Sequence, residues 1–487
     1  MTVSPVEAAA SSDDAVVVLG RTWPYKYIVA VVYVTALFLD VLDLTIVNVA
    51  IPTLGRDFAT ENAEWIVLGY TLSLAIWIPV SGWLGDRFGT KRTFMFAFAA
   101  FIIGSALCGA AQSIEQLIAF RVLQGVGGGM LTPVGVAMLF RAFPPAERAR
   151  ASTYIMIPTM AAPALGPVLG GLLVTHASWR WIFMINIPIG LAGFAFGMRY
   201  LRENREPTAG RFDVPGFVLS GAALALIVYA LSEGPTAGWR SPAVVLTGLL
   251  GLTCAIAMVR VELSSERPML DLRLLGDRLF RQCNLVSFLS TMSFLGLLFV
   301  LPLYLQLLRG QDALHSGLTT FPQAFGVLIS SQFAGRLYAR IGPRRLMSGG
   351  LLAATLVIST FITVDQDTSL WSIRLLMFLR GLCMGFAFVP MQAAAYTRIA
   401  PADNGRASSI FATQRQVAIS IGVAVLASIL ASYMSLSAPP SASEVHQALR
   451  GYHAAFAAAV VISLASAVAA WFIHDSDAEK SMRARHP

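Results

Sequence analysis

Two carboxylates inside a long apolar run are the first residues of this chain that could do chemistry. Asp40 and Asp43 lie within FLDVLDLTIVNVAIP at 38–52. A charged side chain at the centre of a membrane helix costs about 2.5–3.5 kcal/mol on insertion scales and usually marks function. Residues three apart share a helix face, so we expect both carboxylates to look into one cavity and to load and release protons there. The alternative is a pair of hydrated acids near the external end, bonded to Ser or Thr.

An arginine in another apolar run could act together with these acids. Arg121 lies in RVLQGVGGGM at 121–130 and needs a partner or water, so we expect it to bias the proton affinity of a nearby carboxylate. Gly125 and Gly129 form a small-xxx-small face suited to tight helix packing. Arg380 and Arg415 are similar in kind. Either could contact substrate, pair within the second half of the chain, or reach to an interface.

A short basic loop occurs twice. Residues 82–92 read GWLGDRFGTKR and residues 335–345 read GRLYARIGPRR, and each copy connects two long apolar runs. A repeated loop with its flanking segments indicates a duplicated membrane half. Transporters built from repeats place their substrate site between them.

The first copy of this loop has the residues of a conformational gate. Gly82 and Gly89 should allow close helix approach and a tight turn, and Asp86 should accept an ion pair. Such a cluster can hold one conformation and release in the other. The alternative is that the charges only mark the cytoplasmic side. In the second copy Ala339 replaces the acid, which puts an electrostatic latch there in doubt. The basic residues of the first copy are Arg87, Lys91 and Arg92.

A segment rich in proline and glycine, PALGPVLGG at 163–171, lies within a further apolar run. In a membrane it predicts a kinked helix with a flat, closely packed surface that could rock against its neighbour and seal the pathway. The alternative is a kink without a transport role. The residues concerned are Pro163, Gly166, Pro167, Gly170 and Gly171.

Composition identifies the class of fold that must position these residues. Hydrophobic residues make up 56% of the chain and charged residues 13%, against about 25% charged in soluble domains. The apolar residues form runs of 18 or more, which is bilayer-spanning length. The sequence therefore predicts an all-α polytopic membrane protein. Its net charge of +8 fits positive cytoplasmic loops better than nucleic acid.

Fourteen apolar segments can be distinguished, and short connections make consecutive helices antiparallel. Lys and Arg favour the tails and the even-to-odd loops by about four to one, which predicts that the N- and C-termini are both cytoplasmic. The segments are 27–51, 63–83, 94–112, 115–140, 151–175, 181–200, 215–233, 241–261, 284–308, 316–336, 346–364, 371–396, 407–433 and 452–474.

The repeat divides these spans into two six-helix halves with two inserted helices. Span one corresponds to span nine, three to eleven and four to twelve, whereas spans seven and eight have no counterpart. The expected units are a disordered cytoplasmic tail at 1–24, an N-terminal half at 25–201, a linker with two extra helices at 202–283, a C-terminal half at 284–474 and a second tail at 475–487.

Several functions lack their motifs. No G-x-x-x-x-G-K-[ST] occurs, so transport driven by ATP is not expected from this chain alone. No H-E-x-x-H or Cys/His cluster suggests a metal, and no nucleophile–base set suggests an enzyme. We therefore expect no cofactor and no metal, with a proton gradient as the energy source. One complete transport unit per chain makes a monomer sufficient.

Polar and aromatic side chains within the spans are candidates for a substrate cavity. Each could equally make a hydrogen bond in helix packing. They are Asn48, Trp77, Gln124, Tyr304, Gln306, Gln323, Gln392, Gln414 and Arg415.

These motifs together resemble the major facilitator superfamily, and within it the fourteen-span drug:proton antiporters of bacteria. GWLGDRFGTKR resembles the family's loop between spans two and three. Arg121, Gln124 and Gly125 fit its span-four motif. The similarity covers about 25 to 475, although Asp40 has no secure counterpart. Gly166, Pro167, Gly170 and Gly171 fit its antiporter motif in span five, and Leu42, Asp43, Thr45, Asn48, Ala50 and Pro52 fit its span-one motif.

The resemblance implies export of hydrophobic, often cationic drugs or antibiotics across the bacterial inner membrane in exchange for protons. An apolar cavity with carboxylates agrees with an amphipathic substrate. Two alternatives stay open: a dedicated exporter of one metabolite, lipid or amino acid, and a membrane sensor that no longer transports.

Overall fold

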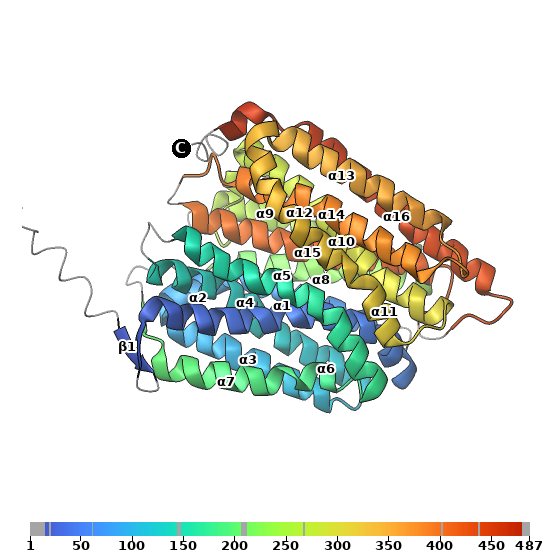
Figure 1. The fold of residues 1–487 in the computed structure, drawn as a ribbon, viewed down its shortest axis with the longest axis horizontal. Coiled ribbons are helices and arrows are strands. Elements are labelled where there is room, and N and C mark those ends of the chain that lie inside the picture. The colour runs from blue at the N-terminus through green and yellow to red at the C-terminus, as the bar shows by residue number, and fades with distance from the viewer. Residues whose placement is uncertain are drawn as a thin grey trace, which may run out of the picture.

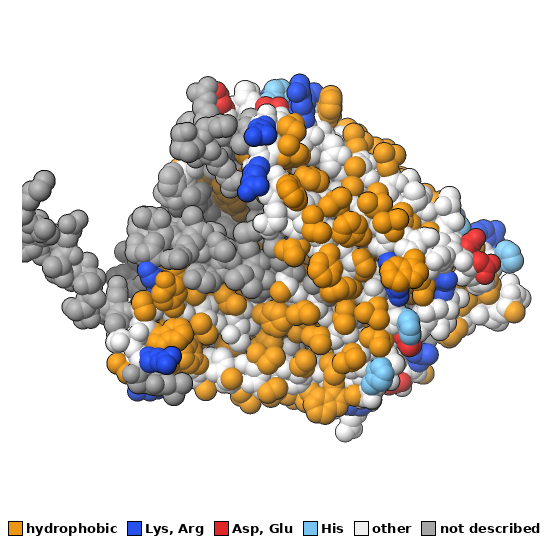
Figure 2. Space-filling model, viewed as in Figure 1, with side chains coloured by type: hydrophobic (Ala, Val, Ile, Leu, Met, Phe, Trp, Pro, Cys, Tyr) orange, Lys and Arg blue, Asp and Glu red, His pale blue; other side chains and the backbone are white. Residues whose placement is uncertain are grey.

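The computed structural model describes residues 15–18, 21–60, 62–143, 148–205, 212–265, 268–400, 403–436 and 439–479. Twelve helices in these ranges are long and apolar enough to cross a membrane. Figure 2 shows hydrophobic side chains over the middle of one face and charged side chains toward its two ends. The chain is therefore a multi-pass, all-α membrane protein, as the composition predicts.

Two strands precede the first long helix and correct one expectation. β1 (Ala15–Val18) and β2 (Arg21–Pro24) form an antiparallel hairpin in which Val17 is opposite Thr22. Part of the expected N-terminal tail is thus ordered, because the run of β-branched Val residues in β1 suits a strand. Residues 1–14 lie outside the described part of the chain.

The N-terminal half forms one bundle, drawn from blue to green in Figure 1. The predicted sixth span is divided at Ile185 into two helices, α6 and α7. The helices are α1 (Tyr25–Asp57), α2 (Trp65–Phe88), α3 (Thr90–Ala110), α4 (Ile114–Ala142), α5 (Arg148–His176), α6 (Trp181–Met184) and α7 (Asn186–Tyr200).

The C-terminal half repeats the packing of the first. α1 packs on α5 and α2 on α4, and their counterparts α10 on α15 and α12 on α14 do the same. The predicted tenth span is divided at Phe321. The elements are η2 (Leu272–Gly276), α10 (Arg278–Leu303), η3 (Tyr304–Leu308), α11 (Ala313–Thr320), α12 (Pro322–Ile341), α13 (Pro343–Thr360), η4 (Phe361–Thr363), α14 (Leu370–Ala395), α15 (Asn404–Ala431), α16 (Val445–Trp471) and η6 (Asp475–Ala478).

Two helices between the halves form a hairpin of their own. α8 (Val214–Ala237) and α9 (Pro242–Ser264) pack on each other, and α8 also packs on α2 of one half and α15 of the other. The inserted pair thus lies beside the seam between the halves. α9 is mostly exposed, which suits contact with lipid.

Glycines allow the closest helix pairs. A Cβ on Gly125 of α4 would lie 2.8 Å from the Tyr70 carbonyl oxygen of α2, and one on Gly129 would lie 2.9 Å from the Leu74 carbonyl oxygen. On α14 a Cβ at Gly381 would lie 2.0 Å from the Gln323 carbonyl oxygen of α12. Only hydrogen fits at such distances, so the backbones meet directly.

Among the residues that the structure describes, the apolar core joins the halves at one end of the molecule only. One cluster contains the second part of α1, from Ile46 to Leu54, together with α10, α15 and α16. Toward the two basic loops the core divides into one cluster within the N-terminal half and another within the C-terminal half. We call the end with loops 177–180 and 309–312 the closed end, and the end with Gly89 and Gly342 the basic end.

Candidate functional site

Asp43 and Arg121 form an ion pair in the interior of the N-terminal half. Asp43 of α1 is fully buried and Arg121 of α4 is 1% exposed. Arg121 also donates to the Gln124 side-chain oxygen (2.7 Å) and to the Ile66 carbonyl oxygen (3.1 Å). The Gln124 amide donates to Asp43 Oδ1 at 3.0 Å. The fold therefore brings together an acid, an arginine and a bridging amide that the sequence analysis named separately.

Two partners of this pair were not foreseen. Asn186 of α7 donates to Asp43 Oδ1 at 3.4 Å and to the Ser105 hydroxyl at 3.0 Å. The Arg121 guanidinium carbon lies 4.0 Å from the centre of the Tyr70 ring. A buried ion pair needs such additional hydrogen bonds and cation–π contacts to offset desolvation. Neither residue belongs to a motif that sequence reasoning could have singled out.

Asp40 has its own partner on another helix. Its Oδ1 accepts a 2.6 Å hydrogen bond from the Tyr70 hydroxyl of α2, and the side chain is 5% exposed. Asp43 turns instead to α4 and α7. The two neighbouring carboxylates therefore bond to different helices, and the expectation that both look into one cavity stays a prediction.

The second half has buried polar groups but no matching acid. Arg380 of α14 is fully buried and donates to the Gln323 side-chain oxygen of α12 and to the Phe294 carbonyl oxygen of α10, at 2.5 Å for the latter. Among the described residues no carboxylate forms an ion pair with it. The halves are alike in fold and differ in charge.

The first basic loop is held by a carboxylate from the end of the half. Gly89 has φ +100°, which favours glycine, and a Cβ there would lie 2.3 Å from Glu203 Oε1. Glu203 accepts from the backbone N–H groups of Lys91 (3.0 Å) and Arg92 (3.1 Å), at the N-terminus of α3. A negative charge at a helix N-terminus is favourable. Glu203 thus fixes the loop to the segment after α7.

The other loop residues are placed as follows. Asp86 lies 3.6 Å from the Arg141 guanidinium of α4, in a partly exposed ion pair. The Lys91 ammonium donates to the Met198 carbonyl oxygen at 2.9 Å, and Arg87 is exposed. Gly82 is exposed and a Cβ there would meet nothing within 4 Å. In this conformation it makes no close helix approach, contrary to expectation.

The second loop has the same kind of cap, from a residue expected to lie in a tail. Gly342 has φ +86°, and Asp475 of η6 accepts from the Arg344 backbone N–H at 2.9 Å. This loop has Ala339 where the first loop has Asp86. Asp475, from the segment after α16, supplies a carboxylate to it instead. Residues 475–479 of the expected C-terminal tail are thus ordered, and 480–487 lie outside the described residues.

The glycine face of α5 packs on both halves. A Cβ on Gly166 would lie 2.1 Å from the Thr45 hydroxyl of α1, and one on Gly170 would lie 2.7 Å from the Ile46 carbonyl oxygen. At the closed end a Cβ on Gly171 would lie 2.5 Å from the Ala313 carbonyl oxygen of α11. Pro163 is partly buried on the same helix.

The partner of this face in the second half is Gly317 of α11. A Cβ there would lie 2.0 Å from the Pro167 carbonyl oxygen. Sequence reasoning missed this residue, because a lone glycine in HSGLTT carries no motif. The two segments meet only in the fold, and together they close the seam.

An acid caps α11 beside this contact. Asp312 accepts from the His315 backbone N–H at 2.7 Å and lies 2.8 Å from His315 Nδ1. Partial burial would raise the pKa of Asp312, but the hydrogen bonds and charge of His315 outweigh it and hold that pKa below its ordinary value.

Most predicted cavity residues bond to protein atoms. Gln306 donates to the Val49 carbonyl oxygen across the seam at 2.8 Å, Gln414 donates to the Ser287 hydroxyl at 2.8 Å, and Tyr304 donates to the Asp365 carbonyl oxygen at 2.5 Å. Asn48 donates within α1 at 3.3 Å and Trp77 packs on Phe217 of α8. Gln392 and Arg415 are exposed.

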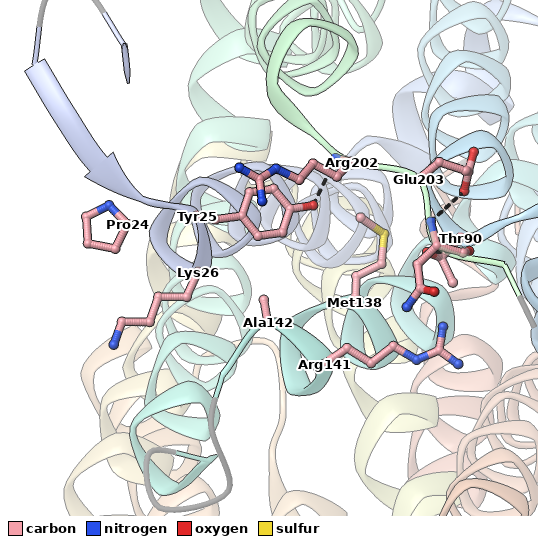
Figure 3. Close-up of a pocket in the computed structure, with 10 residues that line it drawn as sticks. Pro24, Tyr25, Lys26, Thr90, Met138, Arg141, Ala142, Arg202 and Glu203 are labelled. Carbon is pink, nitrogen blue, oxygen red and sulfur yellow. Dashed lines mark hydrogen bonds between the residues drawn. The ribbon is translucent and has the colours of Figure 1, made fainter. Parts of the chain in front are cut away.

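A pocket of about 440 Å³ lies at the basic end and contains none of these residues. The start of α1, the end of α4 and residues 202–204 line it (Figure 3). The Tyr25 hydroxyl accepts from the Arg202 backbone N–H at 2.9 Å, and the Thr90 backbone N–H donates to the Asn204 carbonyl oxygen at 2.8 Å. The pocket therefore belongs to the loop–linker contact and not to the ion pair.

Two repeated helical halves, closed on each other at one end and with ionisable groups in the interior, define a membrane transporter. The sequence matches the family model described as Major Facilitator Superfamily over residues 33–423 and 283–486. The chain belongs to this superfamily of secondary transporters and is not an enzyme.

Two curated relatives named as multidrug resistance proteins illustrate the similarity. The chain is 35% identical over 398 residues to the "Multidrug resistance protein B homolog" of Mycobacterium tuberculosis, covering 80% of this chain and 74% of that protein. It is 29% identical to "Multidrug resistance protein 3" of Bacillus subtilis, with coverage of 81% and 77%.

Solved structures share the fold at low identity. A bacterial homologue of the human lysosomal transporter Spinster, inward-facing and unoccupied, aligns with TM-score 0.65 and 16% identity over 95% of this chain and 98% of that one. A D-xylose–proton symporter aligns with TM-score 0.64 and 14% identity over 93% and 99%.

Proposed function

We propose that this protein is a proton-coupled secondary transporter that exports hydrophobic compounds, cationic drugs and antibiotics among them, by alternating access. The observation that carries the proposal is the buried Asp43–Arg121 pair with its bridging amide, Gln124. An ionisable residue inside a membrane bundle is expensive and its usual roles include proton relay. The names of the relatives support drugs as the substrate class.

The coupling argument follows from the helices that the pair connects. Asp43 lies on α1 and Arg121 on α4, while Asn186 adds α7. Protonation of Asp43 would remove the charge that holds these helices together and leave Arg121 to find other acceptors. A proton could thereby change the packing of α1, which itself packs on α5 and α10. Asp40 is the second candidate for the coupling proton.

Alternation is supported by the division of the core. The halves share one apolar cluster at the closed end and have separate clusters toward the basic end. We propose that the basic loop of 82–92, with Asp86 and Glu203 as its acidic contacts, holds the basic end closed in the other state, in which the end that is closed here is open. α5 is proposed to be the helix that rocks, since its glycine face touches both halves.

Topology completes the proposal. We propose fourteen spans, with α5 and the α11–α12 pair added to the twelve long apolar helices. Both termini are then cytoplasmic, because the basic loops follow the positive-inside rule. The protein would lie in the bacterial inner membrane as a monomer. A dedicated exporter of one metabolite, lipid or amino acid is the alternative.

The test is ethidium efflux from energised cells, for wild type and Asp43→Asn at equal expression, with and without a protonophore. We expect efflux by wild type that the protonophore stops and that Asp43→Asn lacks. Asp367→Asn, an acid in the loop before α14, is the matched control and should export like wild type.

Three results would change the proposal. Wild type that never exports the dye would favour a dedicated exporter. Asp43→Asn that still pumps against a gradient would move coupling to Asp40. Efflux that ignores the protonophore would rule out proton coupling.

A further inference from the structure

Arg415 is the one predicted cavity residue that combines a charge, exposure and an interior position. It lies eleven residues after Asn404, or about 16 Å along α15 at 1.5 Å per residue. Its side chain is exposed, although α15 packs on α2, α8, α10 and α16. Exposure there is unusual for a helix that central.

The surroundings place Arg415 just beneath the closed seam. Five residues further along α15, the Ser420 hydroxyl donates to the Thr71 hydroxyl of α2 at 2.9 Å, a contact between the halves. Arg415 lies on the basic-end side of this contact and is within electrostatic range of Asp40 on α1. It therefore faces the N-terminal half across the seam, on the side where the core is divided.

No protein group satisfies this guanidinium in the described part of the chain. The neighbouring Gln414 donates to Ser287, whereas Arg415 has neither a hydrogen bond nor an ion pair there. Asp40 is near, but its Oδ1 is taken by Tyr70. An intramembrane arginine without a direct partner is a functional-site candidate whose partner is still to be named.

The charge balance of the interior tells which partner fits. Asp43 and Arg121 compensate each other, and Arg380 is satisfied by Gln323 and backbone carbonyls without a carboxylate. Of the charged groups named here, Asp40 then remains as one negative charge against the two positive charges of Arg380 and Arg415. The excess charge is positive, and it is accessible only at Arg415, since Arg380 is fully buried.

We propose that Arg415 recognises the acidic group of amphipathic weak acids, so that the compounds exported include carboxylates and phenolates besides cations. This inference rests on the proposed export function. A guanidinium presents donors that match a carboxylate in a bidentate arrangement. The apolar body of the same compound would lie against the divided core between the halves.

The test uses three probes that share one fluorescent body and differ in charge: dansylglycine (anionic), dansylglycinamide (neutral) and dansylcadaverine (cationic). Their binding to the full chain in lipid nanodiscs is measured for wild type, Arg415→Gln and Arg415→Lys. Arg374→Gln is the matched control, since it removes an arginine of the same half that stacks on Trp371 near the closed end.

We expect wild type to bind dansylglycine and Arg415→Gln to weaken that binding about tenfold or more, the effect of losing a hydrogen bond to a charged group. The neutral and cationic probes should change by less than about twofold in affinity, within ordinary additivity error. Arg415→Lys keeps the charge but loses the bidentate arrangement of donors, so it should lose less acid affinity than Arg415→Gln does, and Arg374→Gln should lose none.

The inference is overturned if wild type does not bind dansylglycine, if Arg415→Gln binds it unchanged, or if the amide loses as much affinity as the acid, which would indicate a packing role. Its failure is separate from that of the export function. Protonophore-sensitive ethidium efflux with acid binding independent of Arg415 refutes only this inference. Arg415-dependent acid binding, without protonophore-sensitive efflux of ethidium or of any of the three probes, refutes only the transport proposal.

Discussion

Gly317→Ala tests the contact that closes the seam. The new Cβ would lie 2.0 Å from the Pro167 carbonyl oxygen, far inside ordinary contact, and the obstacle is helix backbone rather than a flexible side chain. Overpacking of this kind costs about 1–3 kcal/mol. If α5 and α11 separate in the other state, the whole cost falls on the conformation described here. The closed end should then lose population by a factor of about 5 to 150.

The assay is a distance distribution between spin labels on Gln112 and Asp367, in the loops before α4 and α14, after replacement of the four native cysteines. Both positions are exposed and belong to opposite halves. We expect Gly317→Ala to shift the population toward longer distances and to slow export, with little change in thermal stability. Gly349→Ala is the control, because a Cβ there meets nothing within 4 Å. An unchanged distribution with normal export would refute the reasoning.

Three other predictions follow from the described contacts. Tyr70→Phe removes the hydroxyl bonded to Asp40 and keeps the ring beneath Arg121. It should lower the free energy of unfolding in detergent by about 1–3 kcal/mol, and an unchanged free energy would mean that water replaces the hydroxyl. Glu203→Gln removes the charge at the N-terminus of α3 and should speed hydrogen exchange at the backbone N–H groups of Lys91 and Arg92. The free energy of unfolding should fall by about 0.3–1 kcal/mol, and unaltered exchange would contradict the cap. Asp312 has a lowered pKa in the folded protein, so its contribution to stability is complete above its unfolded pKa and is lost as pH falls through the folded value. Wild type should therefore lose more thermal stability between about pH 5 and pH 2 than Asp312→Asn does, and equal losses would show that His315 gives Asp312 no preference for its charged form.

The helical fold could be predicted because its signals are local. Apolar runs define the long helices. The two basic loops reveal a duplication, and the structure confirms it, because α1 packs on α5 in one half as α10 packs on α15 in the other. The breaks at Ile185 and Phe321 were missed, since neither residue interrupts the hydropathy of its run. The hairpin at 15–24 was missed because four-residue strands carry little pattern.

The site was predictable where a motif carried it. Asp43, Arg121 and Gln124 were singled out separately and the structure joins them. Their partners Asn186 and Tyr70 were not singled out, because an amide and a phenol in apolar runs are equally common as packing residues. Glu203, Asp475 and Gly317 lie far along the chain from the groups they contact, so only the tertiary structure reveals them.

The caps at Gly89 and Gly342 have a consequence for biogenesis. In each half the carboxylate comes from the segment that follows the last helix, so a half fastens its own third helix only once its sixth has been made. The N-terminal bundle can therefore be complete before the rest of the chain leaves the ribosome. Two separate polypeptides, divided between Asn204 and Asp213, should accordingly insert as independent units and assemble into one working protein when they are produced in the same cell.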